Sequence, residues 1–223
     1  GAFDVSVGAL MRLWGFRGGP ARKPKDDEIK LALEKTGSGR IRIEGDTVAL
    51  PKGLLLDPGG LGKGWAVDRA VAELSKAGIS AATVDFGSTI HAMGAPPGAA
   101  GWVVGIRDPH DGEKLLGTVT LKDESLSTSG SSERFVEIEG ETWCHILDPR
   151  SGRPVSGVAS VSVIGPNGTE TDFLSTALFV LGEAKGRELA AARKAEALWV
   201  ASDRATAKTP GWSSRCIIIR STM

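Results

Sequence analysis

Residues Thr169 to Gly182 read Thr-Glu-Thr-Asp-Phe-Leu-Ser-Thr-Ala-Leu-Phe-Val-Leu-Gly, the longest largely apolar stretch of the chain. At about 100° per residue, its apolar side chains cover most of the circumference of a helix. We therefore expect a helix that is buried inside the domain. Thr169 or Thr171 is available to cap its start, and Gly182 is available to end it. The rest of the chain is expected to pack around this helix.

A polar stripe interrupts the apolar surface of this helix. Asp172, Ser175 and Thr176 lie within one narrow arc, because residues three and four apart are neighbours, and Phe179 closes the arc. A buried carboxylate without a partner is costly, so this face needs a cation, hydrogen-bond donors or water. Two interpretations stay open. The stripe is a capping network near a helix start, where negative charge is favourable, or an oxygen pair for Mg²⁺.

The composition excludes several classes of function. The chain has 27 basic and 27 acidic residues, and no run of Lys and Arg is interleaved with aromatic residues, so we expect no nucleic-acid partner. The longest apolar stretch, Phe173 to Leu181, is too short to span a membrane. Cys144 and Cys216 are too few for a disulfide framework and lack the spacing of metal ligands.

The alternation of strand-like and helix-like runs, with 30 glycines and 11 prolines, predicts an α+β fold with mixed, largely antiparallel sheets packed against helices. We see no internal repeat and no linker, so residues 1–223 are expected to form a single domain. Besides the buried helix, we expect helices over residues 5–14, 26–34, 65–77 and 184–193. We expect strands over residues 40–44, 47–50, 81–85, 89–93, 101–107, 114–121, 134–138, 142–147, 158–164, 197–201 and 216–220.

A glycine-rich loop, Asp-Pro-Gly-Gly-Leu-Gly-Lys-Gly at Asp57 to Gly64, runs directly into a predicted helix. Small residues let backbone N–H groups approach an anion, and the helix start adds its positive end. Lys63 adds a point charge. The spacing fits neither the Walker loop nor the dinucleotide fingerprint, so a phosphate-binding loop and an ordinary tight turn remain equally compatible with it.

Two other segments have both a structural and a functional interpretation. Ser125 to Ser132 is rich in small hydroxyl residues, which suits a polar ligand but is more often simply a loop. His145 lies on the second strand of a predicted hairpin. A lone histidine on a strand is more often a hydrogen-bonded structural residue than a catalyst.

Four motifs together resemble, in order and spacing, the ApbE family of FAD:protein FMN transferases, also called thiamine biosynthesis lipoproteins. The resemblance covers essentially the whole chain and implies an ApbE-like, T-fold-related architecture. The motifs are Asp57–Asp68 (DPGGLGKGWAVD), Ser127–Gly130 (STSG) with Glu133–Phe135, His145–Gly152 (HILDPRSG) and Thr171–Gly182 (TDFLSTALFVLG).

The resemblance implies an activity. Such enzymes hold FAD with Mg²⁺ and move its FMN part onto a Thr or Ser of a partner flavoprotein, releasing AMP. Attack of a hydroxyl on a pyrophosphate phosphorus requires a metal for the phosphates, donors for the developing charge and a base. The resemblance assigns Asp172, Thr176 and the backbone carbonyl of Gly62 to Mg²⁺, and assigns His145 and Asp172 to catalysis. It places the FAD against Gly59, Gly60, Lys63, Asp85, Gly87, Ser88, Ser127, Thr128, Ser129 and Gly130.

Two other functions would use the same residues. One is FAD pyrophosphate hydrolysis to FMN and AMP, in which water replaces the hydroxyl. The other is FAD binding without catalysis, by an accessory protein for respiratory complex maturation. The resemblance further implies an acceptor subunit in a membrane electron-transfer complex. It also implies a location in the bacterial cell envelope, periplasmic or on the extracytoplasmic side of the inner membrane, with any lipid anchor outside this chain.

The chain departs from the family pattern in several places. Asp85 to Ser88 reads Asp-Phe-Gly-Ser where Asn-Leu-Gly-Gly is usual, Pro58 stands in place of Leu, and Gly62 in place of Ala. Family members also carry a substantial segment ahead of the equivalent of Phe3. We therefore expect the chain to be amino-terminally truncated relative to the family, either as a fragment, which would lack part of the FAD pocket, or as a short branch of the family.

Overall fold

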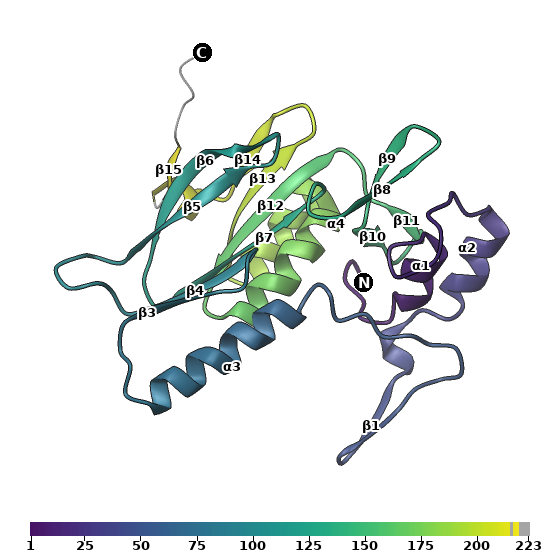
Figure 1. Cartoon of the computed structure of the whole chain (residues 1–223), viewed down its shortest axis with the longest axis horizontal. Coiled ribbons are helices and arrows are strands. Elements are labelled where there is room, and N and C mark those ends of the chain that lie inside the picture. Colours follow the sequence, from purple (N-terminus) through teal and green to yellow (C-terminus); the bar gives the residue numbers. More distant parts are fainter. Residues whose placement is uncertain (215, 219–223) are drawn as a thin grey trace. The chain divides into compact units, whose positions relative to one another are not determined.

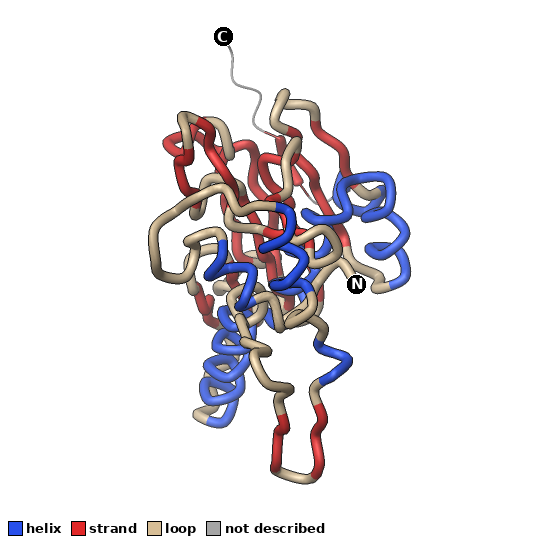
Figure 2. The backbone as a smooth tube through the Cα atoms, turned by 90° about the vertical axis from the view of Figure 1, so that its right-hand side faces the viewer, coloured by secondary structure: helices blue, strands red, loops and turns tan. Residues whose placement is uncertain are grey.

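The computed structural model describes residues 1–214 and 216–218, and their contacts group into two compact units. Unit 1 comprises Gly1–Gly60 and Ser131–Ser156, and unit 2 comprises Leu61–Gly130 and the chain from Gly157 onward. Figures 1 and 2 show the elements of both. Each unit has its own apolar cluster. The expectation of a single domain over residues 1–223 stays a prediction.

Unit 1 combines short helices with antiparallel hairpins. Its elements are α1 (Gly8–Leu13), α2 (Asp26–Leu33), the 3₁₀ turn η1 (Ser38–Arg40), β1 (Arg42–Glu44), β2 (Thr47–Ala49), β8 (Phe135–Ile138), β9 (Glu141–Cys144), β10 (Leu147–Asp148) and β11 (Arg153–Pro154). Apolar side chains of both helices pack with Ile138 and Leu147. Trp14 is fully buried in this cluster, and its indole N–H donates to the carbonyl of Gly152 at 2.9 Å.

Unit 2 has three layers. The central sheet has the order β14-β13-β12-β7-β4-β3, with antiparallel neighbours throughout. Helices α3 and α4 pack on one face (Figure 1), while a sheet of order β15-β6-β5 shares an apolar cluster with the other. The bounds are α3 (Gly62–Lys76), β3 (Ala82–Asp85), β4 (Thr89–Met93), β5 (Trp102–Asp108), β6 (Asp111–Leu121), β7 (Glu124–Gly130), β12 (Val158–Gly165), α4 (Gly168–Ala192), β13 (Glu196–Ala201), β14 (Thr206–Lys208), η2 (Pro210–Ser214) and β15 (Cys216–Ile218).

Helix α4 is the buried helix that the sequence predicts. Leu174, Leu178 and Phe179 are all 0% exposed, because the helix packs against β7, β12 and β13 on one side and against α3. Gly182 has φ +68° and breaks the helical geometry, as its predicted role as a stop requires. The chain then resumes the helix to Ala192, so the two expected helices form one kinked element.

The predicted cap of this helix is wrong. Asn167, not Thr169 or Thr171, is the capping residue. It is extended, with φ −148° and ψ 162°, and its side chain accepts the N–H of Glu170 at 2.8 Å. The hydroxyl of Thr171 instead donates to backbone carbonyls of the preceding turn. The cap lies earlier because the turn after β12 already brings Asn167 into the required extended conformation.

Most predicted strands and hairpins are confirmed within a few residues. The largest correction concerns Ser125 to Ser132, whose commoner interpretation was a loop and most of which forms the interior strand β7. β9 ends at Cys144, so His145 follows the strand rather than lying on it. β14 was not predicted, and residues 219 and 220 of the expected last strand lie outside the described residues. No described helix is both long and apolar enough to cross a membrane.

Candidate functional site

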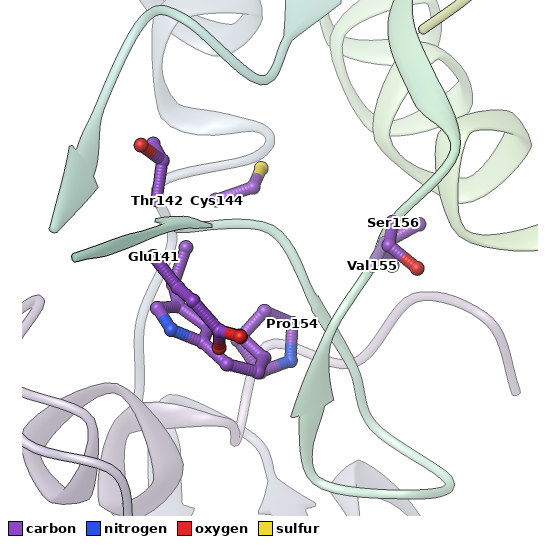
Figure 3. A pocket seen from close by; sticks show the side chains of 7 residues that line it. Glu141, Thr142, Cys144, Pro154, Val155 and Ser156 are labelled. Atoms are coloured by element: carbon purple, nitrogen blue, oxygen red, sulfur yellow. The ribbon is translucent and has the colours of Figure 1, made fainter. Parts of the chain in front are cut away.

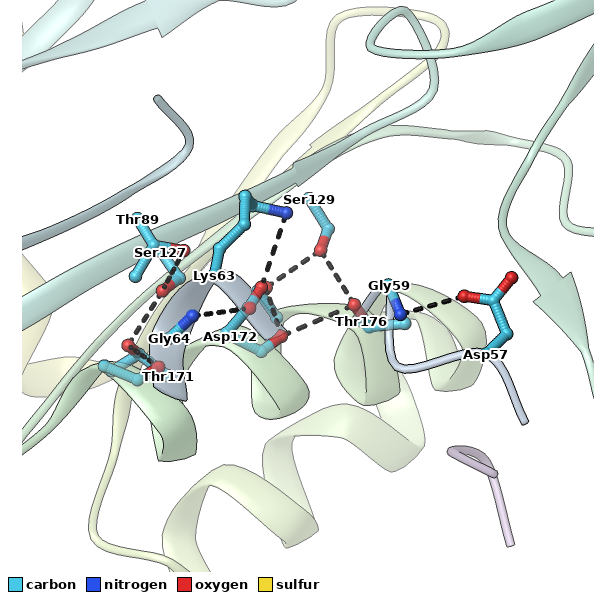
Figure 4. A network of polar contacts seen from close by, with 12 residues as sticks. Asp57, Gly59, Lys63, Gly64, Thr89, Ser127, Ser129, Thr171, Asp172 and Thr176 are labelled. Carbon is cyan, nitrogen blue, oxygen red and sulfur yellow. Dashed lines mark hydrogen bonds and ion pairs between the residues drawn. The ribbon is translucent and has the colours of Figure 1, made fainter. Parts of the chain in front are cut away.

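The first turns of α3 and α4 meet at Asp172. The backbone N–H of Gly64 donates to Asp172 Oδ2 at 2.9 Å, and Lys63 Nζ lies 3.7 Å from Oδ1 (Figure 4). The sequence places the end of the glycine loop and the polar stripe 108 residues apart, and the fold brings them into contact. Asp172 is only 3% exposed. A carboxylate is therefore buried between two helix starts.

The surroundings of Asp172 leave its negative charge incompletely compensated. Burial raises the pKa of Asp172, while the N–H of Gly64 and the charge of Lys63 act in the opposite direction. A carboxylate has about four lone-pair sites for hydrogen bonds or ligands. An ammonium at 3.7 Å is an ion pair but too distant for a good hydrogen bond. The site is therefore suited to a further cation.

Thr176 lies one turn after Asp172 on the same stripe. Its Oγ1 is 3.4 Å from the Asp172 carbonyl oxygen and 3.1 Å from Ser129 Oγ. The side chain is half-buried. The long contact to the carbonyl is weak, so the hydroxyl oxygen has capacity for another partner. The structure thus presents a carboxylate and a hydroxyl one helical turn apart on the same stripe of α4.

This donor set fits Mg²⁺, which prefers oxygen ligands. Within residues 1–214 and 216–218, no group of three or more His, Cys, Asp or Glu side chains gathers into a metal cluster. Such a sparse set is expected where phosphates and water complete the shell. Gly62 opens α3, and a Cβ built on it meets nothing within 4 Å, so the Ala usual in the family would also fit there. The metal role of Gly62 stays a prediction.

Strand β7 places hydroxyl groups on both faces of the sheet. Ser127 Oγ lies 2.8 Å from Thr171 Oγ1, and Ser129 Oγ lies 2.8 Å from Ser175 Oγ, so both side chains are hydrogen-bonded to α4. Thr128 instead contacts β12 on the opposite face. The predicted FAD contacts of residues 127–130 stay a prediction. The two buried serines already have protein partners.

The turn between β3 and β4 is held against β7. Asp85 Oδ1 accepts the N–H of Gly87 at 2.7 Å, and Gly87 has φ +77°, which suits glycine. The carbonyl of Ser88 accepts the N–H of Thr128 at 2.8 Å. Two of the segments predicted to contact FAD are therefore neighbours in the fold, although neither was predicted to touch the other.

Gly59 and Gly60 belong to unit 1. The N–H of Gly59 donates to Asp57 Oδ1 at 2.8 Å, and Arg17 binds both oxygens of Asp57 at 2.8 and 2.9 Å. This bidentate pair fixes the start of the glycine loop. Its phosphate contacts stay a prediction.

His145 also belongs to unit 1 and contacts Arg134, the residue before β8. Its Nδ1 lies 2.9 Å from the carbonyl oxygen of Arg134. A carbonyl can only accept, so Nδ1 carries a proton, and Nε2 holds the lone pair of the neutral ring. That tautomer is the one a general base needs.

Unit 1 also contains a cavity of about 400 Å³ (Figure 3). It is lined by Glu141 to Cys144 and by Pro154 to Ser156. None of the residues predicted to bind FAD or a metal lines it.

Sequence reasoning assigned no role to Asp68. Its Oδ1 accepts the N–H of Gly168 at 2.6 Å, and its Oδ2 accepts the N–H and hydroxyl of Thr169 at 2.9 and 2.5 Å. One signal was readable: Asp68 follows Gly64 by one helical turn and shares its face. Its partners Gly168 and Thr169 lie 100 and 101 residues away in sequence, so the contact itself could not be read from a local pattern.

These elements describe a mixed α+β protein with a buried acid between two helix starts, beside a lysine in the first turn of α3 where the glycine-rich loop ends. The chain belongs to the ApbE family, whose model matches residues 1–199.

Relatives of known name agree with this assignment. The chain is 38% identical over 203 residues to the FAD:protein FMN transferase of Treponema pallidum, covering 83% of this chain and 56% of the relative. It is 36% identical over 221 residues to that of Rhodobacter capsulatus, covering 96% and 42%. The chain thus spans about half the length of the curated relatives it matches.

Solved structures of the family share the fold. The ApbE protein of Thermotoga maritima superposes with a TM-score of 0.90 at 34% identity, covering 96% of this chain and 72% of that one. The apo flavinyl transferase ApbE of Pseudomonas stutzeri gives 0.84 at 32%, covering 96% and 69%. The predicted α+β, ApbE-like fold is therefore confirmed.

Proposed function

We propose that this protein transfers FMN from FAD to a Thr or Ser hydroxyl of a partner flavoprotein, with release of AMP, in a Mg²⁺-dependent reaction. The observation that carries the proposal is the buried Asp172 carboxylate facing the first turn of α3. A lysine beside it and a hydroxyl one turn away suit a metal–diphosphate site. The relatives named FAD:protein FMN transferase give independent support.

In this mechanism the glycine-rich loop Gly59 to Gly64 and the first turn of α4 face the diphosphate. Asp172, Thr176 and the Gly62 carbonyl are the proposed ligands of Mg²⁺, which when bound neutralises phosphate oxygens and makes the phosphorus more electrophilic. The Lys63 side chain is 36% exposed and contributes a point charge for a phosphate. The amino terminus of α3 favours negative charge in the same place.

The bond changes define what else the protein must supply. The acceptor oxygen forms a bond to the phosphorus of the FMN half, and the bond from that phosphorus to the bridging oxygen breaks, so that AMP leaves. The acceptor hydroxyl must lose its proton. His145 is the proposed base, because hydrogen bonding of Nδ1 to Arg134 directs the basic lone pair to Nε2.

The test is an assay of covalent flavin attachment. The protein is incubated with FAD, Mg²⁺ and a candidate acceptor, and in-gel flavin fluorescence and AMP are both measured. We expect fluorescent acceptor and one AMP for each flavin attached. AMP without labelled acceptor would indicate hydrolysis, and FAD binding without AMP would indicate an accessory role. Asp172→Ala should abolish turnover. Glu183→Ala, which changes a half-exposed acid on the same helix, should not.

We also propose an acceptor subunit of a membrane electron-transfer complex and a location in the bacterial cell envelope. The support is membership of the ApbE family. Fractionation of the native cell, followed by detection of the protein and of flavin-labelled subunits, tests both. Labelled acceptor confined to the cytoplasm would contradict the proposed location.

A further inference from the structure

We propose that Asp68 is a positioning residue for the cation site, because it fixes the start of α4 and thereby the direction of Asp172. This inference rests on the metal role proposed for Asp172. Asp68 touches neither Asp172 nor the predicted metal ligands in any observed contact. It acts through backbone groups of the next helix.

The two helices exchange contacts reciprocally. On α3, Gly64 and Asp68 are one turn apart, and on α4, Gly168 and Asp172 are one turn apart. The N–H of Gly64 donates to Asp172 at 2.9 Å, and the N–H of Gly168 donates to Asp68 at 2.6 Å. Each helix thus supplies an N–H from its first turn to a carboxylate of the other, which fixes their relative position at two points.

Close backbone packing leaves this crossing little room to adjust. A Cβ built on Gly64 would lie 2.1 Å from the Gly168 carbonyl oxygen, and one built on Gly168 would lie 2.7 Å from the Gly64 carbonyl oxygen. The helices meet backbone to backbone, so a small displacement of either first turn also moves Asp172 relative to Lys63.

The two carboxylates differ in the kind of partner they have. Asp68 accepts three uncharged donors at the start of α4, from Gly168 and from the N–H and hydroxyl of Thr169. Asp172 accepts the N–H of Gly64, is also stabilised by the backbone N–H of Lys63, and pairs with the Lys63 ammonium 3.7 Å away. Three fixed donors make Asp68 a structural clamp, whereas the 36% exposed Lys63 side chain can give way to a metal ion at Asp172. We therefore assign Asp68 to holding the helix start and Asp172 to binding the cation.

The experiment measures metal binding directly in the full chain, using Mn²⁺ as the probe by calorimetric titration and electron paramagnetic resonance. Asp68→Ala removes all three acceptor contacts, and Asp68→Asn keeps a side chain of the same size with one acceptor oxygen. Glu73→Gln is the matched control, because Glu73 is an exposed acid on the same helix. Hydrogen exchange of the amides of residues 168–172 reports on the clamp.

We expect Mn²⁺ to bind Asp68→Ala about 10-fold more weakly, which is the low end of the effect of losing a direct hydrogen-bond partner of a metal ligand, because Asp68 acts through the backbone of α4. Asp68→Asn should lie between Asp68→Ala and wild type. Amide exchange should accelerate in the same order. Raising Mg²⁺ should restore transfer by the Asp68 variants but not by Asp172→Ala.

Wild-type Mn²⁺ affinity in a folded Asp68→Ala protein would overturn the positioning role. If that variant does not fold, the same result for Asp68→Asn would overturn it. Absence of Mn²⁺ binding by wild type would instead refute the metal assignment of Asp172, so the two failures are distinguishable.

Discussion

Lys63 Nζ lies 3.7 Å from Asp172 Oδ1, near enough for an ion pair but too far for a strong hydrogen bond. The pair joins a half-exposed cation to a buried anion. In the proposed reaction the ammonium has a second use, since a phosphate beside the metal would attract it more strongly than a single carboxylate. This relationship makes the electrostatics of the site testable one residue at a time.

Replacing Lys63 should separate metal binding from FAD binding. In Lys63→Gln we expect Mn²⁺ affinity to be unchanged or higher, because a nearby positive charge is removed, while the KM for FAD rises about 10-fold as a phosphate partner is lost. Lys76→Gln, at the exposed end of the same helix, is the control. Loss of Mn²⁺ binding in Lys63→Gln, with FAD binding retained, would contradict this division.

Asp172 should destabilise the protein when no divalent ion is present. Burial raises its pKa, so the neutral acid's contribution to stability is complete at low pH and is lost as the pH rises through the folded-state pKa. In EDTA at pH 7, Asp172→Asn should therefore unfold at higher urea than wild type. The difference should close as the pH falls through that pKa.

Magnesium should reverse this order of stability. A ligand at 100 times its Kd stabilises the folded state by about 2.7 kcal/mol, and only wild type retains the carboxylate. The measurement is urea unfolding of both proteins with and without Mg²⁺. Equal stabilisation of the two proteins would show that the ion binds elsewhere.

Alanine substitutions at two glycines of the glycine-rich loop should have different effects on the stability of the protein. Gly64→Ala would place a Cβ 2.1 Å from the Gly168 carbonyl oxygen, and overpacking of this kind costs about 1–3 kcal/mol or more. Gly62→Ala meets open space and should be neutral or slightly stabilising, because Ala suits a helix better than Gly. Urea unfolding compares them, and equal stabilities would refute the close crossing.

Cys144 should react slowly despite lining the cavity in unit 1 (Figure 3). Burial raises the pKa of its thiol to about 11, so about one molecule in a thousand carries the reactive thiolate at pH 8. Iodoacetamide labelling of a Cys216→Ser variant should be slow when folded and normal in urea. Rapid labelling of the folded variant at pH 8 would contradict this assignment.

Most helices and strands could be predicted because each is determined by the residues within it and at its ends. The hairpin around Gly45 and Asp46 and the apolar circumference of α4 both follow from residues within one turn or strand. Strand β7 was ambiguous because hydroxyl residues have no apolar alternation. Only the sheet shows that Ser127 and Ser129 satisfy their hydroxyls on α4.

The residues of the candidate site could be predicted from the sequence, but the contacts that hold them in place could not. Asp172, Thr176 and Lys63 could be named from spacing and family resemblance, and the fold brings Asp172 to the first turn of α3. The clamp by Asp68 joins residues 100 positions apart. A local sequence pattern cannot indicate a hydrogen bond to a backbone N–H far away in the chain, so this clamp could be found only in the structure.

Anomalous diffraction from a crystal soaked in Mn²⁺ would locate the divalent ion at atomic detail. We expect a peak within bonding distance of an Asp172 carboxylate oxygen and Thr176 Oγ1, and loss of that peak in Asp172→Ala. A peak elsewhere, with Asp172 still contacting only Gly64 and Lys63, would contradict it.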